Sequence, residues 1–415
     1  MTADREPDVI VVGGGIVGIC SALSLAEAGQ SVLLLDRDEP GQGASFGNAG
    51  VISPWSVVPQ GMPGLWKSIP GMLLNPDGAA SIAPRHALNY LPWLMRFLKD
   101  SAPDRVREIS RAMFLLCGDS VALYRHHLQG TGQEHLLQDS MYVHAYRNVE
   151  SATLNSLGAR LRQDKGAELE VVDGAALREI EPAISPDFRA AVLIKGQARS
   201  LDSGLIGKTL ARKLSEMGGE IRQVSVETIQ PSGEGWQVIT KGEILSAAKV
   251  VVSAGAWSAK LLEPLGMRLP LAFERGYHVS FEGAGVVVNN TVMDAESHVV
   301  ANDMACGLRL AGIAEFAGPD TPPNERRIKT LVRKARALFP AIRTEKMSEW
   351  MGVRPSFPDS LPVLEHCPGH KGLFAAFGHS HYGMMMAPRT GQLVANLVTG
   401  KIPNEDLSPF SSSRF

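Results

Sequence analysis

Residues 9–36 read VIVVGGGIVGICSALSLAEAGQSVLLLD, and this stretch decides the fold class. An apolar strand leads through a glycine-rich turn into a helix, and a second apolar strand follows. The turn places Gly13, Gly15 and Gly18 in the G-x-G-x-x-G spacing. The first glycine permits the tight turn, the second lets backbone approach a pyrophosphate, and the third lets helix and strand pack closely. Because the helix N-terminus offers free N–H groups to phosphates, we expect a Rossmann-like dinucleotide-binding domain.

Asp36 closes the second strand, 18 residues after Gly18. A carboxylate at this position typically binds the hydroxyls of an unmodified ribose, which argues against NADP. Ile16 and Val17 open the helix and Arg37 follows the acid, so we expect all three in the same site. The glycine spacing alone does not distinguish FAD from NAD.

Composition and charge exclude several classes of function. The chain has 415 residues, enough for two or three domains, with 44% apolar and 20% charged residues. A formal net charge of −2 and the lack of a basic stripe argue against nucleic-acid binding. The four cysteines (Cys20, Cys117, Cys306 and Cys367) are far apart, which argues against a cysteine zinc site or a disulfide framework.

The sequence also bears on location. The first residues, MTADREPD, are acidic and do not resemble a secretory signal. No run of about 18 uninterrupted apolar residues predicts a membrane span. We expect a cytoplasmic protein, with peripheral contact on the inner face of the membrane as an open alternative.

Strand and helix patterns alternate along the whole chain. Asp202 or Ser203 caps a predicted helix over 204–217. The other predicted elements are strands at 140–148, 220–228 and 248–258, a strand-rich region at 271–316, and helices within 103–135, 150–165 and 324–338.

Nucleotide-type segments at the start, middle and end of the chain predict two interleaved domains, unlike the contiguous halves of a simple NAD dehydrogenase. The fold class is α/β, with α+β mixing: a Rossmann-like FAD-binding domain interleaved with a mixed-sheet substrate domain. We assign residues 1–57, 189–262 and 345–405 to the cofactor domain. Residues 58–188 and 263–344 form the substrate domain.

Residues 59–100 are rich in Pro, Trp, Met and Leu, and the later part has helical periodicity. Such a segment forms a core helix with a covering loop, an active-site lid, or a shallow membrane contact. We favour lid or core, because the basic face of an interfacial helix is thin here.

Taken together, seven segments resemble the FAD-dependent amino-acid oxidoreductases that include D-amino-acid oxidase, glycine oxidase and sarcosine oxidase. Within this family the chain is most similar to D-amino-acid dehydrogenases of the small-subunit type. The resemblance covers nearly the whole chain in one order. Its segments are the glycine turn, the SFGNAG loop, DSGLIGKTLARKL, VVVSAGAWS, RGYHVSF, GVRPSFPDSLPVLE and GHSHYGMMMAPRTG.

The resemblance implies FAD as the cofactor. Ser45 would contact the pyrophosphate, and the strand with Ala254, Gly255 and Trp257 would lie near the adenine half. The remaining implied flavin contacts are Asn48, Ala49, Gly50, Gly378, His379, Gly383 and Met384. A glycine-rich turn that opens a helix suits the negative charge of reduced flavin. Relatives with covalent flavin carry a cysteine in the block at 352–359, which has none here, so we expect non-covalent FAD.

The resemblance also implies the substrate contacts. Arg354 in the GxRP motif would bind the substrate carboxylate through two parallel hydrogen bonds. The alternative for Arg354 is a structural role, as a loop cap or a partner of Asp359. Tyr277 would line the cavity or only pack, and Arg275 is less favoured to face the same way. His379 is a candidate polar contact near the flavin, and we expect no metal.

The implied reaction is hydride transfer from the α-carbon of a D-amino acid to flavin N5, which gives an imine and then a 2-oxo acid and ammonia. The electron acceptor is expected to be a quinone or another carrier. Within the fold, a D-proline or 4-hydroxy-D-proline dehydrogenase and a glycine, sarcosine or 2-hydroxy-acid oxidoreductase stay open. A flavoprotein without catalysis is the alternative from another class. Neither oligomeric state nor oxygen reactivity follows from the sequence.

Overall fold

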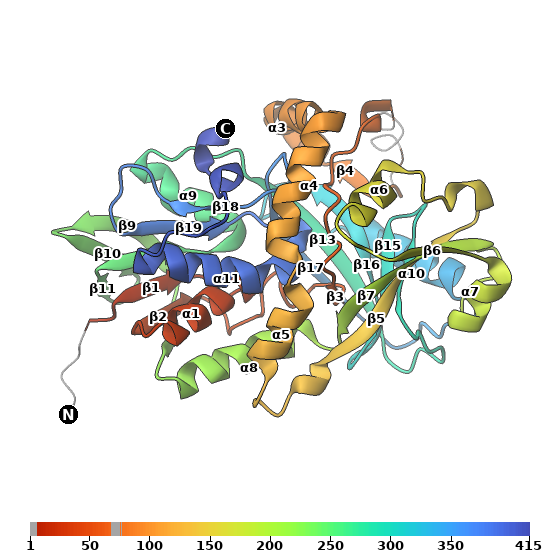
Figure 1. The fold of residues 1–415 in the computed structure, drawn as a ribbon, viewed down its shortest axis with the longest axis horizontal. Coiled ribbons are helices and arrows are strands. Elements are labelled where there is room, and N and C mark those ends of the chain that lie inside the picture. The colour runs from red at the N-terminus through yellow and green to blue at the C-terminus, as the bar shows by residue number, and fades with distance from the viewer. Residues whose placement is uncertain (1–5, 68–74, 76) are drawn as a thin grey trace.

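The computed structural model describes residues 6–67, 75 and 77–415, and it contains two large β-sheets side by side (Figure 1). Helix α4 (Pro103–Cys117) runs across the boundary between them in this view. This arrangement confirms the predicted class, a Rossmann-like sheet joined to a second mixed sheet.

The first sheet has six strands in the order β18-β19-β12-β1-β2-β8. All neighbours are parallel except β18, which is antiparallel to β19. The strands are β1 (Val9–Val12), β2 (Val32–Asp36), β8 (Glu220–Gln223), β12 (Lys249–Val252), β18 (Val363–His366) and β19 (Leu373–Phe377). Strand β1 is buried on both faces, as its continuous apolar run predicts.

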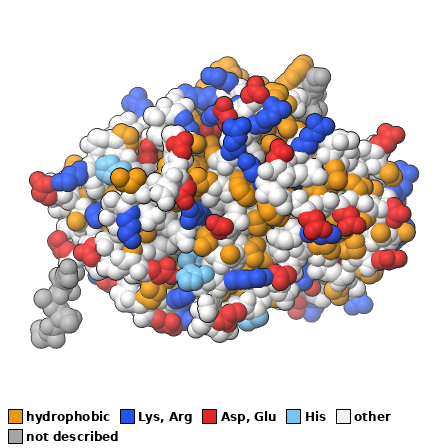
Figure 2. Space-filling model, viewed as in Figure 1, with side chains coloured by type: hydrophobic (Ala, Val, Ile, Leu, Met, Phe, Trp, Pro, Cys, Tyr) orange, Lys and Arg blue, Asp and Glu red, His pale blue; other side chains and the backbone are white. Residues whose placement is uncertain are grey.

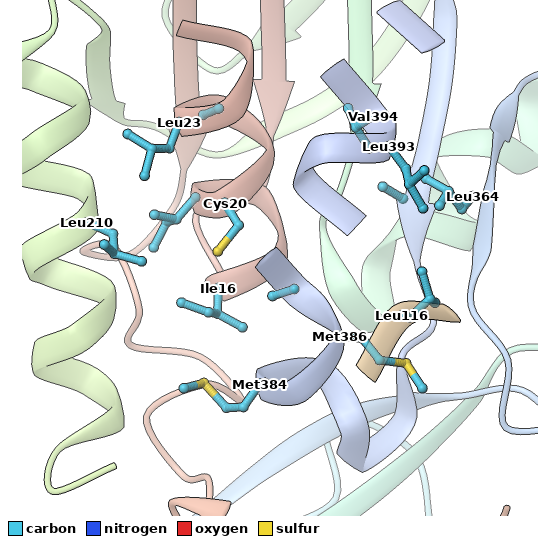
Figure 3. Packing of buried hydrophobic residues seen from close by; sticks show 14 of the residues in the cluster. Ile16, Cys20, Leu23, Leu116, Leu210, Leu364, Met384, Met386, Leu393 and Val394 are labelled. Carbon is cyan, nitrogen blue, oxygen red and sulfur yellow. The ribbon is translucent and has the colours of Figure 1, made fainter. Parts of the chain in front are cut away.

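Three helices cover one face of this sheet: α1 (Ile16–Glu27), α8 (Ser203–Glu216) and α11 (Gly383–Thr399). In Figure 3, α1 lies between the other two, with Leu23 facing Leu210 of α8. Helices α1 and α11 approach very closely, because a Cβ on Gly391 would lie 2.4 Å from the carbonyl oxygen of Cys20.

A small sheet covers the opposite face. It contains β9 (Val226–Ser232), β10 (Gly235–Thr240) and β11 (Ile244–Ala247), and α9 (Ser258–Leu262) packs beside it. The alternation of side chains along β1 serves both faces, since Val9 and Val11 pack on the helices while Ile10 and Val12 pack on the small sheet.

The second sheet has ten strands. The main order is β17-β13-β16-β15-β14-β5-β7-β3, with β4 on β16 and β6 on β7. The strands are β3 (Val51–Ile52), β4 (Ala80–Ile82), β5 (Leu137–Tyr146), β6 (Leu169–Asp173), β7 (Ala190–Ser200), β13 (Ala272–Phe281), β14 (Thr291–Asp294), β15 (Val299–Met304), β16 (Gly307–Phe316) and β17 (Met347–Ser356). One face packs on α10 (Glu325–Leu338) in an apolar core, and parts of the other face line the cavity described below.

The remaining helices are α3 (Ala87–Asp100), α5 (Ser120–Leu128), α6 (Leu157–Gln163) and α7 (Gly174–Ile180). Helix α8 begins as predicted, with the Asp202 carboxylate accepting a hydrogen bond from the backbone N–H of Leu205. None of the helices in the described part of the chain combines the length and the apolar character that a bilayer crossing needs.

Two predicted strands have wrong boundaries. Residues 220–228 contain the whole of β8 and the start of β9, because the chain leaves the first sheet after Val224 donates its N–H to the Asp36 carbonyl at 2.6 Å. The strand predicted over 248–258 ends at Val252, and a 3-10 helix (Gly255–Trp257) follows. The mixed pattern of 220–228 and the apolar pattern of 248–258 both hide a change of direction.

The predicted domain division also differs from the sheets in three places. Strands β3, β7 and β17 belong to the ten-stranded sheet, although residues 51–52, 190–200 and 347–356 were assigned to the cofactor domain. The pattern of a strand predicts that the segment joins a sheet, but not which of two sheets it joins.

Helix α3 is a surface helix and not the core helix that we considered. Trp93 is its buried residue, while Leu88 is 85% exposed and Leu91 and Met95 are also exposed. Figure 2 shows hydrophobic side chains among basic ones at this upper edge of the molecule. Of the segment 59–100, residues 68–74 and 76 lie outside the described residues, so the lid prediction there stays open.

Candidate active site

A cavity of about 1010 Å³ runs between the two large sheets. At one end it is lined by the glycine turn after β1 and by the ends of β2 and β12, and at the other by β13, β17 and β5. Ligands bind at the carboxyl ends of strands in open α/β sheets, and this volume is at the upper limit for ligand pockets. The cavity therefore has room for an extended dinucleotide and a small substrate.

The three fingerprint glycines have three distinct environments. Gly13 has a φ of +116°, and a Cβ there would lie 2.3 Å from the Ser253 carbonyl oxygen. A Cβ on Gly18 would lie 1.8 Å from the Gly13 carbonyl oxygen, so this glycine packs the helix on the turn and does not line the cavity. A Cβ on Gly15 would meet only the Ser45 hydroxyl, at 3.6 Å, and would project into the space that a pyrophosphate needs.

Ser45 lies at the N-terminus of α1, where its hydroxyl accepts a hydrogen bond from the Ile16 N–H at 2.9 Å. Ile16, Val17 and Ser45 line the cavity, as do Asn48 and Ala49. The predicted pyrophosphate contact is thus next to the positive end of a helix.

Two buried side chains that the sequence reasoning missed hold the loop around Asn48. Arg309 donates to the carbonyl oxygens of Phe46 and Asn48 at 2.9 and 2.8 Å, and Asn302 donates to that of Ala49 at 3.2 Å. The only sequence signal is a polar residue inside a strand pattern, which does not tell what it contacts.

Gly50 was expected to contact the flavin, but it is not among the residues that line the cavity. It has a φ of +81°, and a Cβ there would lie 2.4 Å from Nδ2 of Asn302. The glycine is required by close packing on the second sheet. Its N–H donates to Oδ1 of Asn48 at 2.8 Å, which closes the loop.

The predicted adenosine end is formed by Asp36, Arg37 and Trp257. The Asp36 carboxylate accepts hydrogen bonds from the N–H groups of Gly14 and Asp38, at 2.5 and 2.8 Å, and burial raises its pKa. A carboxylate has about four acceptor sites, so a ribose hydroxyl still has room. The Arg37 guanidinium lies 4.0 Å from the centre of the Trp257 ring.

Other residues complete this end of the cavity. Ala254 and Gly255 line it as predicted. Residues 224–227, at the switch between β8 and β9, line it as well and were missed, because the sequence suggested one uninterrupted strand there.

The start of α11 forms the predicted flavin end. Gly378, His379, Gly383 and Met384 all line the cavity, and a Cβ on Gly383 would meet only the Cβ of His379, at 3.8 Å. Met384 also packs beside Ile16 in the core (Figure 3). The open helix N-terminus suits a group that gains negative charge.

His379 is buried, and burial lowers its pKa to about 3. Its Nε2 shares a hydrogen bond with the Thr390 hydroxyl at 3.0 Å. The group of three possible metal ligands found in the described residues (Glu27, His126 and His127) lies outside the cavity and does not involve His379.

Arg354 lies in the cavity on β17, paired across the sheet with Glu274 of β13. Its Nη1 donates to Oε1 of Glu274 at 2.7 Å, and a Cβ on Gly276 would lie 2.3 Å from Nη2. The glycine thus makes room for the guanidinium. The alternative partner that we considered, Asp359, is bound by Arg414 at 2.7 Å instead.

Glu274 was missed by the sequence reasoning and is the centre of a hydrogen-bond network. Its carboxylate also accepts from the Ser356 hydroxyl at 2.6 Å and from the Gln60 amide at 3.0 Å, and that amide lies 2.9 Å from Nδ1 of His381. Burial alone would raise the pKa of Glu274, but Arg354, His381 and these donors outweigh burial and lower it. Glu274 is therefore a carboxylate that orients Arg354.

Tyr277 does not line the cavity, so the expectation that it faces the substrate was wrong. Its hydroxyl donates to Oε2 of Glu315 at 2.6 Å, and Arg275 lies on the same side, with its Nη1 3.5 Å from that oxygen. Side chains alternate along a strand, so the face that presents Glu274 to the cavity turns Tyr277 toward α10. Arg275 and Tyr277 thus do share a face.

An aromatic wall stands beside the flavin loop. Trp350 lines the cavity and stacks on His278, with ring centres 5.1 Å apart. A Cβ on Gly47 or Gly352 would lie about 2 Å from the Trp350 ring, so two glycines hold the indole between them. His278 accordingly supports this wall, and its Nδ1 lies 3.2 Å from the Gly47 carbonyl oxygen.

Fold and site define a dinucleotide-binding enzyme with an anion-binding group in the same cavity. The chain belongs to the family described as DAO, FAD dependent oxidoreductase, whose model matches residues 8–397. It is 34% identical to a D-amino-acid oxidase of Bradyrhizobium diazoefficiens, with 98% of each chain covered. It is 32% identical to a D-amino acid dehydrogenase of Dechloromonas aromatica, with 97% of this chain and 99% of that one covered.

Solved structures show the same fold. Glycine oxidase from Geobacillus kaustophilus has a TM-score of 0.76 and 22% identity, covering 99% of this chain and 100% of that one. L-proline dehydrogenase from P. horikoshii also has a TM-score of 0.76, with 18% identity, covering 99% and 98%. The protein is an FAD-dependent oxidoreductase, and the open edge at Gly15, the two helix N-termini and the Asp36 carboxylate suit this cofactor.

Proposed function

We propose that the protein oxidises the α-carbon–nitrogen bond of a small D-amino acid. The observation that carries the proposal is Arg354, which lies in the cofactor cavity and is oriented by the buried Glu274. The names of the full-length relatives, D-amino-acid oxidase and D-amino acid dehydrogenase, support the substrate class. D-Proline or 4-hydroxy-D-proline is the alternative within the fold, followed by glycine, sarcosine or a 2-hydroxy acid.

Arg354 is suited to bind the substrate carboxylate. A guanidinium has five N–H donors in a planar fork, and Glu274 uses only one side of it. The ion pair prevents rotation of the guanidinium, so the substrate enters a preorganised site. The carboxylate anchor then fixes which face of the α-carbon is presented.

Bound FAD would supply the acceptor for the hydride that leaves the α-carbon. The residues of the chain orient the substrate and exclude water. The pKa values of His379 and His381 are lowered by burial to about 3 and 4, so both rings are neutral at pH 7. A substrate that enters with a neutral amine needs no obligatory base, and its imine product hydrolyses to a 2-oxo acid and ammonia.

An anaerobic absorbance titration of the flavin-loaded protein tests this proposal. The candidate substrates are D- and L-alanine, D-proline, cis- and trans-4-hydroxy-D-proline, glycine, sarcosine and lactate. We expect loss of the flavin band with D-amino acids and not with L-alanine. Reduction by lactate alone would contradict the proposal, and reduction by none would indicate a flavoprotein without this catalysis.

We also propose that FAD is non-covalent. All four cysteines lie in the described part of the chain, and none of them lines the cavity. Acid precipitation should leave the yellow colour in the supernatant, whereas colour in the pellet would show a covalent bond.

A quinone or another carrier is our proposed electron acceptor, with peripheral membrane contact through α3. The exposed side chains of Leu88, Leu91 and Met95 support such a contact. We expect the wild-type protein to float with anionic vesicles and Leu88→Glu to abolish this flotation. A wild-type protein that stays in the soluble fraction would contradict the proposal.

A further inference from the structure

Arg162 is a second arginine on the substrate side of the cavity, and no carboxylate among the described residues pairs with it. It lies near the end of α6, which the Ser156 hydroxyl caps by accepting the Ala159 N–H at 3.2 Å. Within the described residues its guanidinium makes one hydrogen bond, from Nη1 to the Gly158 carbonyl oxygen at 3.2 Å, and no ion pair. Four of its five N–H donors are therefore left for water or a ligand.

Three other arginines that are buried or partly buried have a carboxylate partner, whereas the buried Arg309 and Arg327 donate to backbone carbonyl oxygens and do not line the cavity. These pairs are Arg275 with Glu315, Arg354 with Glu274 and Arg414 with Asp359. Buried charges are normally paired, because an isolated ion loses its hydration. Burial lowers the pKa of Arg162, and the groups that oppose this shift are the hydroxyls of Tyr142, Tyr382 and Tyr146, not carboxylates.

Two neighbouring groups on β5 also have free polar atoms. Tyr142 and His144 line the cavity and contact each other edge to face, with ring centres 4.5 Å apart. Among the residues that the structure describes, Nε2 of His144 is buried without a hydrogen-bond partner, and the Tyr142 hydroxyl has only the Met293 sulfur, at 3.5 Å. A cation, a hydroxyl and an imidazole nitrogen thus lie together without an acceptor.

The charges of the cavity indicate what this group of residues binds. Arg354 and Glu274 neutralise each other, so Arg162 leaves one positive charge on the substrate side. An amino acid whose only carboxylate binds Arg354 would leave Arg162 without an acidic partner, whereas one with an acidic side chain would supply a second carboxylate. The histidine contributes no charge, since burial and the nearby Arg162 lower its pKa to about 3.

We propose that Arg162, with Tyr142 and His144, forms a second anion site that selects dicarboxylic D-amino acids such as D-glutamate or D-aspartate. This inference rests on the proposed function, in which Arg354 binds the α-carboxylate. The side-chain carboxylate then pairs with Arg162, and Arg162 is a specificity-determining residue for the reaction.

The test compares kcat/KM of the flavin-loaded protein for D-glutamate and D-aspartate with that for their amides, D-glutamine and D-asparagine. We expect the acids to be preferred by at least tenfold, and Arg162→Met to lower the acid-to-amide ratio by at least tenfold. Arg160→Met is the matched control, because Arg160 is exposed on the same helix and outside the cavity; it should leave the ratio unchanged.

Ligand binding to the wild-type protein tests the inference without turnover and without a variant. Flavin absorbance changes report Kd, and we expect glutarate to bind the wild-type protein at least tenfold more tightly than glutaramate. Equal Kd values, or flavin reduction by D-amino acids without an acid preference, would overturn this inference alone. An equal loss for acids and amides in Arg162→Met would place Arg162 at the common carboxylate. If no D-amino acid reduces the flavin, the proposed function itself fails.

Discussion

Among single residues, the contact between Arg354 and Glu274 explains how a charged guanidinium is stabilised in a partly buried site before substrate binds. The carboxylate is 1% exposed and the guanidinium 22%, so Glu274 is the anchored partner and Arg354 the accessible one. A buried pair of this kind contributes little net stability, but the loss of one partner is costly. Its value here is the fixed direction of the guanidinium.

Replacement of Arg354 by Met should therefore lower kcat/KM for amino-acid substrates by about 10- to 100-fold, since a charge-assisted hydrogen bond contributes about 1.5–3 kcal/mol. Arg354→Lys should lie between, because an ammonium keeps the charge but not the fork. Steady-state kinetics measure the effect, and an unchanged KM in Arg354→Met would contradict the role.

Loss of Arg354 also leaves Glu274 buried and unpaired, which lowers stability. The double variant Arg354→Met with Glu274→Gln removes that charge. It should recover thermal stability without recovering kcat/KM, which separates folding from binding.

The sequence predicted some of these residues and not others. Arg354 belongs to the GxRP motif, so the resemblance to the family predicted its role. Glu274, Gln60 and Arg162 belong to no such motif, since their roles arise only when β13, β17 and α6 meet. Tyr277 was placed on the wrong face because β13 is buried on both faces, so polar residues on either face could have lined a cavity.

Among the secondary-structure elements, the turn between β1 and α1 places a glycine that folding requires and a glycine that ligand binding requires within six residues. Gly18 is needed for packing and Gly15 for ligand access, and Gly15 has φ −70° and ψ 170°, which any residue adopts. The same spacing therefore contains a fold requirement and a cofactor requirement.

Gly15→Val and Gly18→Ala should fail in different ways. Gly15→Val should unfold as the wild-type apoprotein does and yet not retain FAD, because the side chain occupies the phosphate space. Gly18→Ala should destabilise the apoprotein itself, because its Cβ meets the Gly13 carbonyl oxygen. Thermal unfolding and FAD titration measure the two effects, and a Gly15→Val protein that purifies yellow would refute the phosphate assignment.

Elements with a strong local signal were predicted well. The turn, α8 with its Asp202 cap and α10 all follow from spacing and capping. The switch from β8 to β9 was missed, because strand-type residues continue across it and do not record where the chain changes sheets. For the same reason, residues 224–227 were not predicted to line the cavity.

At the scale of the whole molecule, the site exists only because two sheets from interleaved segments share one cavity. Several histidines are buried there and nearby, and burial lowers their pKa values: His127 and His381 to about 4, and His144, His278 and His379 to about 3. In the unfolded chain each has a pKa near 6.5.

The folded protein should therefore lose stability in mild acid. Below about pH 6.5 the unfolded chain takes up protons that the folded histidines do not, and each such histidine costs up to about 1.4 kcal/mol per pH unit. Stability is complete above that pH and falls toward pH 4. Denaturant unfolding at saturating FAD between pH 7.5 and 5 measures the slope, which His278→Gln should reduce. A free energy of unfolding that is constant over this range would contradict the burial of neutral histidines.

The proposed reaction transfers a hydride from the α-carbon of a D-amino acid to FAD in this cavity. Anaerobic rapid mixing with D-alanine and with α-deuterated D-alanine tests it most directly, because both report the rate of flavin reduction. The account predicts loss of the flavin absorbance with both, and a several-fold slower rate with the deuterated substrate. No reduction by D-alanine or the best D-amino acid of the panel would contradict the claim.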